Sequence, residues 1–396
     1  MKSKLFNLVI AALCIITATS CLKDDNRTIM LGNGQVGTDI PKDELATPNP
    51  DIVDPNTDIP NFQYIIEKRD KQYVVRMDMT GIQDPETKEY LRLVGTGGCA
   101  CGDTQNVWLS IDDKPKGLRV YNNSDGQLTG NAVKNDFVFL VDNSGSMDDE
   151  ADVIARDIVN WAANLNSKLD VRFGCVGYDG EITGAINMTS YSELSAYLNR
   201  STGVKRTVGF AGSDADALKS QSGNYSTSTN VVECSMGALH FASDLFAFRE
   251  GANRIYVNFT DEPNSPNQGK LLTKYSVHYL ESQDNWNTSL GTIHTVFSED
   301  PGKYKDKWED YVNERPWYMS DYTGGTTLFT DGSFSGVSLD DLPITLAMQH
   351  SYIIWFTIDE KLIDGNSHIV RLTVKAEDGS VRAERFFNVE FKLSTK

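Results

Sequence analysis

The sequence predicts a mixed α/β protein in which a doubly wound, mostly parallel sheet spans residues 131–349 and is flanked by a β-sandwich region. In the middle of the chain, apolar runs of strand length alternate with segments of helical apolar spacing, as in a parallel sheet covered by helices. Residues 61–130 and 350–396 show instead the period-two alternation of half-buried strands. Three C-terminal strands alone make a poor domain, so we expect the N- and C-terminal segments to form the sandwich together.

The central elements follow from this alternation. The run DFVFLV at 136–141 is almost continuously apolar, which is typical of a parallel strand buried on both faces. Further buried strands are predicted over 169–178, 254–260, 291–298 and 326–331. Helical spacing predicts a helix through Ile154, Ile158, Trp161 and Leu165, a second through Val231, Cys234, Ala238, Ala242 and Leu245, and a third near 339–348. Right-handed crossovers would connect these strands.

The N-terminus has the features of an export signal. Lys2 and Lys4 precede a short apolar stretch, and small residues lead to Cys21. This stretch is too short for a membrane span, so residues 1–20 are expected to be a signal peptide. The segment resembles a bacterial lipobox, which implies lipidation at Cys21. The alternative is ordinary cleavage that leaves Cys21 as a free thiol.

The residues that follow Cys21 indicate where the exported chain is located. The sequence Leu-Lys-Asp-Asp resembles the lipoprotein export signal of Bacteroidetes, which implies an outer-membrane lipoprotein displayed on the cell surface. Residues 21–60 hold five prolines and no aromatic residue, a composition that predicts a disordered tether. A flexible coil of forty residues spans roughly 35 Å. The membrane contact expected for this chain is the lipid anchor alone.

Charge and cysteine usage limit the possible partners. The 37 basic and 55 acidic residues give a formal charge of −18, and nucleic-acid binding needs clustered basic residues, so no nucleic-acid partner is expected. An exported chain can form disulfides, but a Cys-x-Cys pair such as Cys99 and Cys101 rarely bridges to itself. Cys175 and Cys234 lie in apolar patterns and are expected to be buried thiols.

One short motif has the side chains of a metal-binding site. Asp142, Ser144 and Ser146 form Asp-x-Ser-x-Ser directly after the predicted strand 136–141. Ligands bind open α/β sheets at the carboxyl ends of the strands. A carboxylate and two hydroxyls are hard oxygen ligands, which suit Mg²⁺, Mn²⁺ or Ca²⁺ and not zinc. The motif therefore predicts a divalent metal site at this edge of the sheet.

The motif resembles the metal-ion-dependent adhesion site of von Willebrand factor A domains. The family also has an Asp after its fourth core strand, which Asp261 in FTDEPN supplies, and a Thr in a loop before a helix. Thr229 is the expected Thr, and Ser228 and Thr227 are alternatives. The resemblance covers roughly residues 133–348. Bacterial proteins also exist in which an Ig-like domain precedes such a module and a β segment follows it, and the two flanks of this chain resemble them.

The resemblance implies roles for these residues. Ser144 and Ser146 would bind the metal directly, Thr229 directly or through water, and Asp142 and Asp261 mostly through water. Such a metal keeps one coordination position for a Glu or Asp side chain of a protein partner. Asp149 and Glu150 match acids that bind a second ion in integrin β subunits. Glu150, however, stands where that family has an Asp. The favoured interpretation is that both acids lie in the first turn of a helix, where acids complement the helix dipole.

We therefore expect a surface-tethered adhesion or interaction protein and no enzyme. One alternative is an assembly subunit of an envelope or fimbrial complex, in which the metal is only structural and the β flanks donate or accept strands. A metal-dependent hydrolase is less favoured, because the sequence places no nucleophile and base beside the motif.

Overall fold

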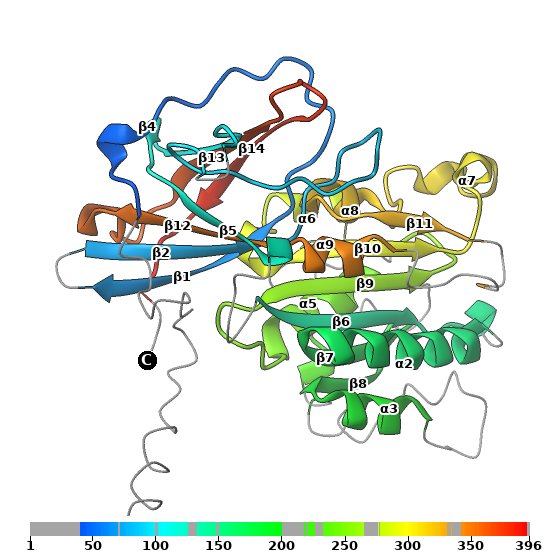
Figure 1. Ribbon diagram of the computed structural model, residues 1–396. Coiled ribbons are helices and arrows are strands. Elements are labelled where there is room, and N and C mark those ends of the chain that lie inside the picture. Colours follow the sequence, from blue (N-terminus) through cyan, green and yellow to red (C-terminus); the bar gives the residue numbers. More distant parts are fainter. Residues whose placement is uncertain are drawn as a thin grey trace, which may run out of the picture.

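The computed structural model describes residues 40–69, 72–99, 102–125, 133–147, 150–199, 218, 221–225, 233–264, 276, 278–330, 334 and 342–393. These residues form two lobes (Figure 1): an α/β lobe around one six-stranded sheet and a sandwich lobe of two antiparallel sheets. The predicted combination of a mostly parallel sheet with flanking antiparallel strands is confirmed.

The sheet of the α/β lobe has the strand order β11-β10-β9-β6-β7-β8. Its strands are β6 (Lys134–Asp142), β7 (Asp170–Tyr178), β8 (Ile182–Thr189), β9 (Asn253–Thr260), β10 (Thr292–Phe297) and β11 (Thr327–Phe329). All neighbours pair in parallel except β8, which is antiparallel to β7. The five strands that the sequence predicts here are all present, and β8 is an addition.

Helices cover both faces of this sheet. The α-helices are α2 (Glu150–Lys168), α3 (Tyr191–Asn199), α5 (Ser235–Leu245), α6 (Tyr279–Gln283), α7 (Pro301–Lys307), α8 (Tyr318–Thr323) and α9 (Ile344–Gln349). Short 3-10 helices lie in the connections of both lobes; they are η1 (Asp43–Leu45), η2 (Asn123–Asp125), η3 (Gly145–Met147), η5 (Thr288–Leu290), η6 (Glu309–Tyr311) and η8 (Glu360–Leu362). The helices predicted around Trp161, Ala238 and Met348 correspond to α2, α5 and α9.

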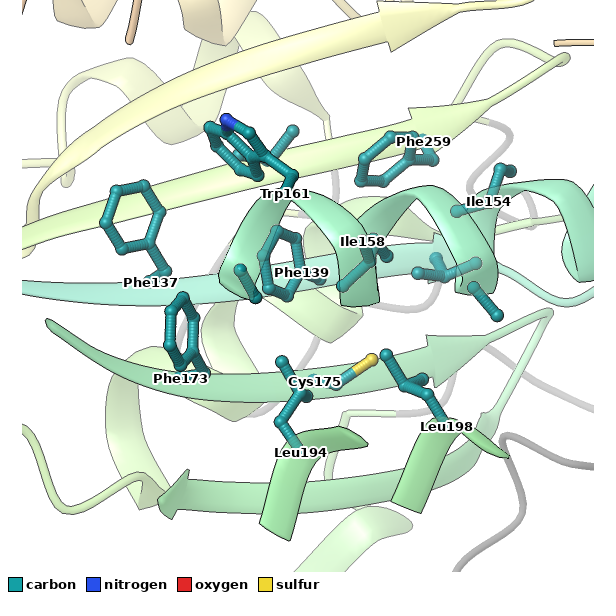
Figure 2. Close-up of a cluster of buried hydrophobic side chains, with 14 of the residues drawn as sticks. Phe137, Phe139, Ile154, Ile158, Trp161, Phe173, Cys175, Leu194, Leu198 and Phe259 are labelled. Atoms are coloured by element: carbon teal, nitrogen blue, oxygen red, sulfur yellow. The ribbon is translucent and has the colours of Figure 1, made fainter. Parts of the chain in front are cut away.

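Strand β6 shows why its sequence is apolar throughout. Phe137 and Phe139 point into the core beneath α2, α3 and α9, whereas Val138 and Leu140 join the core beneath α5, α6 and α8. Figure 2 shows the first of these cores, in which Trp161 of α2 lies over the phenylalanines of the sheet. The ring of Trp161 is edge-on to Phe137 and to Phe139, with centroids 5.6 and 5.9 Å apart.

The sandwich lobe interleaves both ends of the chain. One sheet has the order β1-β2-β12-β5 and the other β14-β13-β3-β4. Its strands are β1 (Phe62–Arg69), β2 (Gln72–Met79), β3 (Val107–Ile111), β4 (Lys114–Pro115), β5 (Arg119–Asn122), β12 (Tyr352–Ile358), β13 (His368–Lys375) and β14 (Arg382–Val389). Strand β12 lies between β2 and β5, and β13 pairs with β3. The C-terminal segment therefore completes the N-terminal β region, as predicted.

Residues 40–60 differ from the sequence expectation of a tether that extends to residue 60. Asn49 donates to the Arg371 carbonyl at 3.2 Å and to Thr373 Oγ1 at 3.0 Å, and Asn56 donates to the Ser380 carbonyl at 2.7 Å. Ile59 is buried in the sandwich core. These side-chain amides bond to β13 and to the turn between β13 and β14, so this proline-rich segment lies on the sandwich. Residues 21–39, the rest of the predicted tether, lie outside the described residues.

The two lobes are joined by hydrogen bonds. Asn61 Nδ2 donates to the Gly291 carbonyl at 2.8 Å, the Phe62 amide donates to Thr288 Oγ1 at 3.0 Å, and Gln63 Nε2 donates to the Ser289 carbonyl at 2.9 Å. The start of β1 is thereby fixed to the segment that leads into β10.

The cysteines of the α/β lobe are as predicted: Cys175 and Cys234 are buried thiols. Cys99 forms a disulfide with a partner outside the described residues. Within the described ranges, no helix is long and apolar enough to cross a membrane. The predicted signal peptide and lipidation site at Cys21 lie outside these ranges.

Candidate functional site

The candidate site forms where β6 and β9 end. The two strands are parallel neighbours, with Val141 opposite Phe259, so their carboxyl ends lie at the same edge of the sheet (Figure 1). Asp142 ends β6, and Asp261 directly follows β9. The topology therefore brings together two segments that are more than a hundred residues apart in the chain.

The loop after β6 is folded by its own side chains. Asp142 Oδ1 accepts a hydrogen bond from the Ser144 amide at 3.0 Å. Helix η3 then places Ser146 on the surface while Met147 is fully buried in the core beneath α2. This alternation anchors the loop through Met147 and leaves the Ser146 hydroxyl accessible.

The predicted ligands lie next to one another. Ser144 Oγ and Ser146 Oγ are 2.9 Å apart, and Ser146 Oγ donates to Asp261 Oδ1 at 3.1 Å. Neighbouring oxygens around an octahedral Mg²⁺ with bonds of about 2.1 Å lie about 3 Å apart. The spacing and the chemistry of these oxygens fit a small divalent cation.

The electrostatics of the site are dominated by carboxylates. Asp142 is fully buried, and its Oδ2 accepts from Thr260 Oγ1 at 2.8 Å. Burial raises the pKa of Asp142 well above its usual value, and the charges of Glu233 and Asp261 raise it further. The pKa of Glu262 is raised to about 8, first by burial and then by its hydrogen bond to Glu233 and by neighbouring acids. A divalent cation would offset this repulsion.

Two of these acids were not predicted from the sequence. Glu233 lies just before α5 and is 8% exposed, and Glu262 follows Asp261. The signal for Glu233 is a single acid within the apolar run VVECSM, because acids are rarely buried without a partner. Thr260, which bonds to Asp142, is the other contributor that the sequence analysis missed.

Several predicted site residues lie outside the described residues. These are Thr229 with its alternatives Ser228 and Thr227, and Asp149 of the possible second ion site. Glu150 is the first residue of α2, a position that also suits the helix-dipole interpretation. In the described part of the chain, no group of three or more His, Cys, Asp or Glu side chains has the arrangement of a metal centre. The candidate site differs from such centres because hydroxyls contribute to it.

Comparison with known proteins gives only distant structural likenesses. No family model and no curated protein matches the sequence. Proximal thread matrix protein 1 from the mussel byssus is similar over 55% of this chain and 47% of its own, with 13% identity and a TM-score of 0.31. The pilus adhesin SpaC from Lactobacillus rhamnosus GG is 11% identical over 85% of this chain and 48% of its own, with a TM-score of 0.32.

A third structure covers more of its own length. Three N-terminal domains of the type V pili tip protein Mfa5 from Porphyromonas gingivalis are 10% identical over 85% of this chain and 78% of theirs, with a TM-score of 0.32. The chain spans about half the length of the first two structures. At TM-scores near 0.3 the superpositions do not define a shared fold, and none of these proteins assigns a function to this chain.

Proposed function

We propose that the α/β lobe is a von Willebrand factor A-type module that binds a divalent metal, Mg²⁺ or else Mn²⁺ or Ca²⁺, and through it a protein partner. The observation that carries this proposal is the convergence of three side chains near the buried Asp142. Ser144 Oγ lies 2.9 Å from Ser146 Oγ, and Ser146 Oγ lies 3.1 Å from Asp261 Oδ1. Thr229 is proposed to complete the set from the loop before α5. The role is one of binding and not of catalysis.

The proposed partner group is a Glu or Asp carboxylate. Ser146 is exposed, so a ligand from outside can reach a metal held beside its hydroxyl. Hydroxyl ligands are neutral and leave the cation attractive to an additional carboxylate. The partner would therefore add one oxygen to a coordination shell that the chain supplies only in part.

A peptide-binding experiment tests this function. The immobilised full chain is screened with Mg²⁺ against peptides that carry Glu or Asp and against matched peptides with Gln or Asn. Binding to the acidic peptides alone is expected, and both EDTA and the Ser144→Ala substitution should abolish it. Peptide binding that survives EDTA and Ser144→Ala contradicts the metal bridge.

The location of the protein is also part of the proposal. We propose that Cys21 is lipidated and that the anchor holds the chain on the outer face of the outer membrane. Labelling of the cells with a fatty-acid analogue should mark the wild-type chain but not the Cys21→Ala variant. External protease should cleave the wild-type protein on intact cells, and full protection would argue against display on the surface.

A role as an assembly subunit is the second candidate. It is favoured by β14, which is an edge strand of its sheet among the described residues and carries Phe386 with 58% of its surface exposed. Strands can be added at such sheet margins by a partner chain. Purification of the native protein from membranes as a lone monomer would count against this role.

A further inference from the structure

A cavity of about 190 Å³ lies between the two lobes. Residues of both lobes line it, and they include Asp58, Ile82, Tyr90, His294, Thr326 and Pro343. His294 lies in β10, and Thr326 directly precedes β11. These positions are toward the amino ends of the two parallel strands, so the cavity is at the opposite edge of the sheet from the candidate metal site.

The walls of this cavity are held in place by contacts across the lobes. Tyr90 Oη donates to the Pro343 carbonyl at 2.7 Å, and the Gly81 amide donates to the Ala347 carbonyl at 2.7 Å. The ring of Tyr90 also stacks on that of His350, with centroids 5.1 Å apart. A Cβ atom at Gly81 would lie only 2.7 Å from the Tyr90 ring, so the backbone and the ring need this glycine. The cavity is therefore preformed, as small-molecule sites usually are.

His294 offers a hydrogen-bond donor to this cavity. The residue is 7% exposed, and its Nδ1 accepts from the Thr326 amide at 3.1 Å and lies 2.9 Å from Thr326 Oγ1. Burial lowers the pKa of His294 to about 3, so the ring is neutral at physiological pH. A neutral imidazole that accepts at Nδ1 carries its proton on Nε2. In the described part of the chain no acceptor bonds to this Nε2–H group, although a buried donor normally has a partner.

The other lining residues restrict what the cavity can hold. Asp58 is exposed and provides an acidic acceptor, and no lysine or arginine is among the described residues that line the cavity. An anion would therefore lack a countercharge, and a simple cation would leave the Nε2–H of His294 without an acceptor. A hydroxylated molecule satisfies both groups, because each hydroxyl donates as well as accepts.

Size and apolar surface narrow the ligand further. Ile82, Tyr90 and Pro343 supply apolar surface against which the C–H groups of a ring can pack. The volume is below the roughly 300–1,000 Å³ of pockets for drug-sized ligands, which leaves room for one small ring.

We propose that this cavity binds a single sugar ring, with His294 Nε2–H donating to one hydroxyl and Asp58 accepting from another. The site requires neither the metal nor the protein partner proposed above. It gives the chain a second binding site, for a carbohydrate, at the junction of its lobes.

The experiment titrates the full chain in EDTA with two series of sugars. One series contains free glucose, galactose, mannose and N-acetylglucosamine, and the other contains their methyl glycosides. Calorimetry should show binding of at least one of them. His294→Asn and Asp58→Ala should each lower the affinity for that sugar by about tenfold or more, because each removes one hydrogen bond to it.

The variants are chosen to preserve the fold. The amide oxygen of His294→Asn can still accept from Thr326, and Asp58 is exposed, so its substitution tests the site even if His294→Asn fails to fold. His240→Asn is the matched control. His240 is 1% exposed and burial lowers its pKa to about 4, but its ring contacts Trp286 and does not line the cavity. This control should leave the sugar affinity unchanged.

The outcomes also identify the source of the sugar. Binding of the methyl glycosides supports recognition of the terminal residue of a glycan, whereas binding of the free sugars alone supports a soluble monosaccharide. The proposal is overturned if no sugar of either series binds, or if binding is equally tight in Asp58→Ala and in a folded His294→Asn. Binding that appears only when Mg²⁺ or Ca²⁺ replaces EDTA would place the sugar at the metal site and would also overturn it.

Discussion

Asp142 combines two roles in a single buried side chain. Its two oxygens hold the loop through the Ser144 amide and the Thr260 hydroxyl, and its charge faces other carboxylates. In a medium of low dielectric constant such a charge destabilises the metal-free protein, and its raised pKa reflects that cost. A bound divalent cation would turn the same charge into a source of stability.

Asp142→Asn should therefore separate these two roles. An amide keeps an oxygen that can accept one of the hydrogen bonds but removes the charge, so in EDTA the variant should melt at the wild-type temperature or higher. The increase in melting temperature that we expect Mg²⁺ to give the wild type should be absent from the variant. Thermal melts with Asp284→Asn, a solvent-exposed control, would check the assignment. A metal-induced increase that persists in Asp142→Asn would contradict it.

The His368–Asp112 pair gives a second prediction for single residues. Burial lowers the pKa of His368, but hydrogen bonds to Asp112 and Asp364 outweigh burial and raise it overall above 6.5. The hydrogen bond from His368 lowers the pKa of Asp112 below 3.8. The stabilisation by this pair is therefore fully present only between the ordinary pKa values of the two groups, 3.8 and 6.5. It is lost as the pH rises through the folded pKa of His368 and as the pH falls through the folded pKa of Asp112.

Urea unfolding of the wild type and His368→Asn measures this effect. The difference in the free energy of unfolding should be larger at pH 5.5 than at pH 8.5, by less than about 1 kcal/mol because Asp112 is partly exposed. The packing lost in the variant is the same at both values and cancels in the comparison. Equal differences at the two pH values would show that the ion pair contributes nothing.

Sequence could predict part of the site at this scale. Asp142, Ser144 and Ser146 are close in the chain, and Asp261 follows a strand that is recognisable by its apolar run, so the sequence alone points to their convergence. Glu233 could not be placed in this way. Its charge acts on Asp142 because α5, which it precedes, packs against the sheet, and this packing is a consequence of tertiary structure.

At the scale of elements, burial decides what the sequence reveals. Strands β6, β7, β9 and β10 are buried almost throughout, which requires the continuous apolar runs that predict them. Edge strand β8 is only partly buried, includes Gly184 and Asn187, and was not predicted. Helices α6, α7 and α8 have seven residues or fewer, too short to establish an apolar period.

Arg249 links the starts of β6 and β7 at the opposite end of the sheet from the candidate site. Its Nε bonds to Asp136 Oδ1 at 2.7 Å, its Nη2 bonds to the Asn135 carbonyl at 3.0 Å, and its Nη1 pairs with Asp170. The starts of β6 and β7 are thus joined to the segment after α5. The Asp136 side chain is fully buried, so Arg249 is needed to compensate its charge.

Arg249→Ala should lower the free energy of unfolding by about 3–5 kcal/mol, because it leaves Asp136 buried and unpaired. The double variant with Asp136→Asn should be more stable than Arg249→Ala alone, since no uncompensated charge remains. Chemical unfolding of the two variants provides the comparison. A double variant that is less stable than the single one would mean that packing of Arg249, and not its charge, matters.

At the scale of the whole molecule, the chain leaves the sandwich to build the α/β lobe and then returns to it. Strand β12 inserts between β2 and β5, so the sandwich cannot be complete before the C-terminal segment is made. The hydrogen bonds from Asn61, Phe62 and Gln63 fix the two lobes together. Through this connection, metal binding by the α/β lobe would also stabilise the sandwich lobe.

We therefore expect the two lobes to unfold together. Calorimetry of the wild type should show a single transition, and Mg²⁺ should slow hydrogen exchange in β2 and β12 as well as in β6 and β9. In a variant with Asn61→Ala and Gln63→Ala, the protection of β2 and β12 should no longer respond to metal. Two independent transitions in the wild type would contradict this coupling.

The most direct test of the metal site is a thermal melt of the full chain in EDTA and in Mg²⁺, beside Ser144→Ala. A ligand at a hundred times its dissociation constant stabilises the folded state by about 2.7 kcal/mol, which corresponds to several degrees for a protein of this size. We predict this increase for the wild type and none for Ser144→Ala, whose metal-free melt should be nearly unchanged. An equal increase in both proteins, or no increase in the wild type with Mg²⁺, Mn²⁺ or Ca²⁺, would contradict the account.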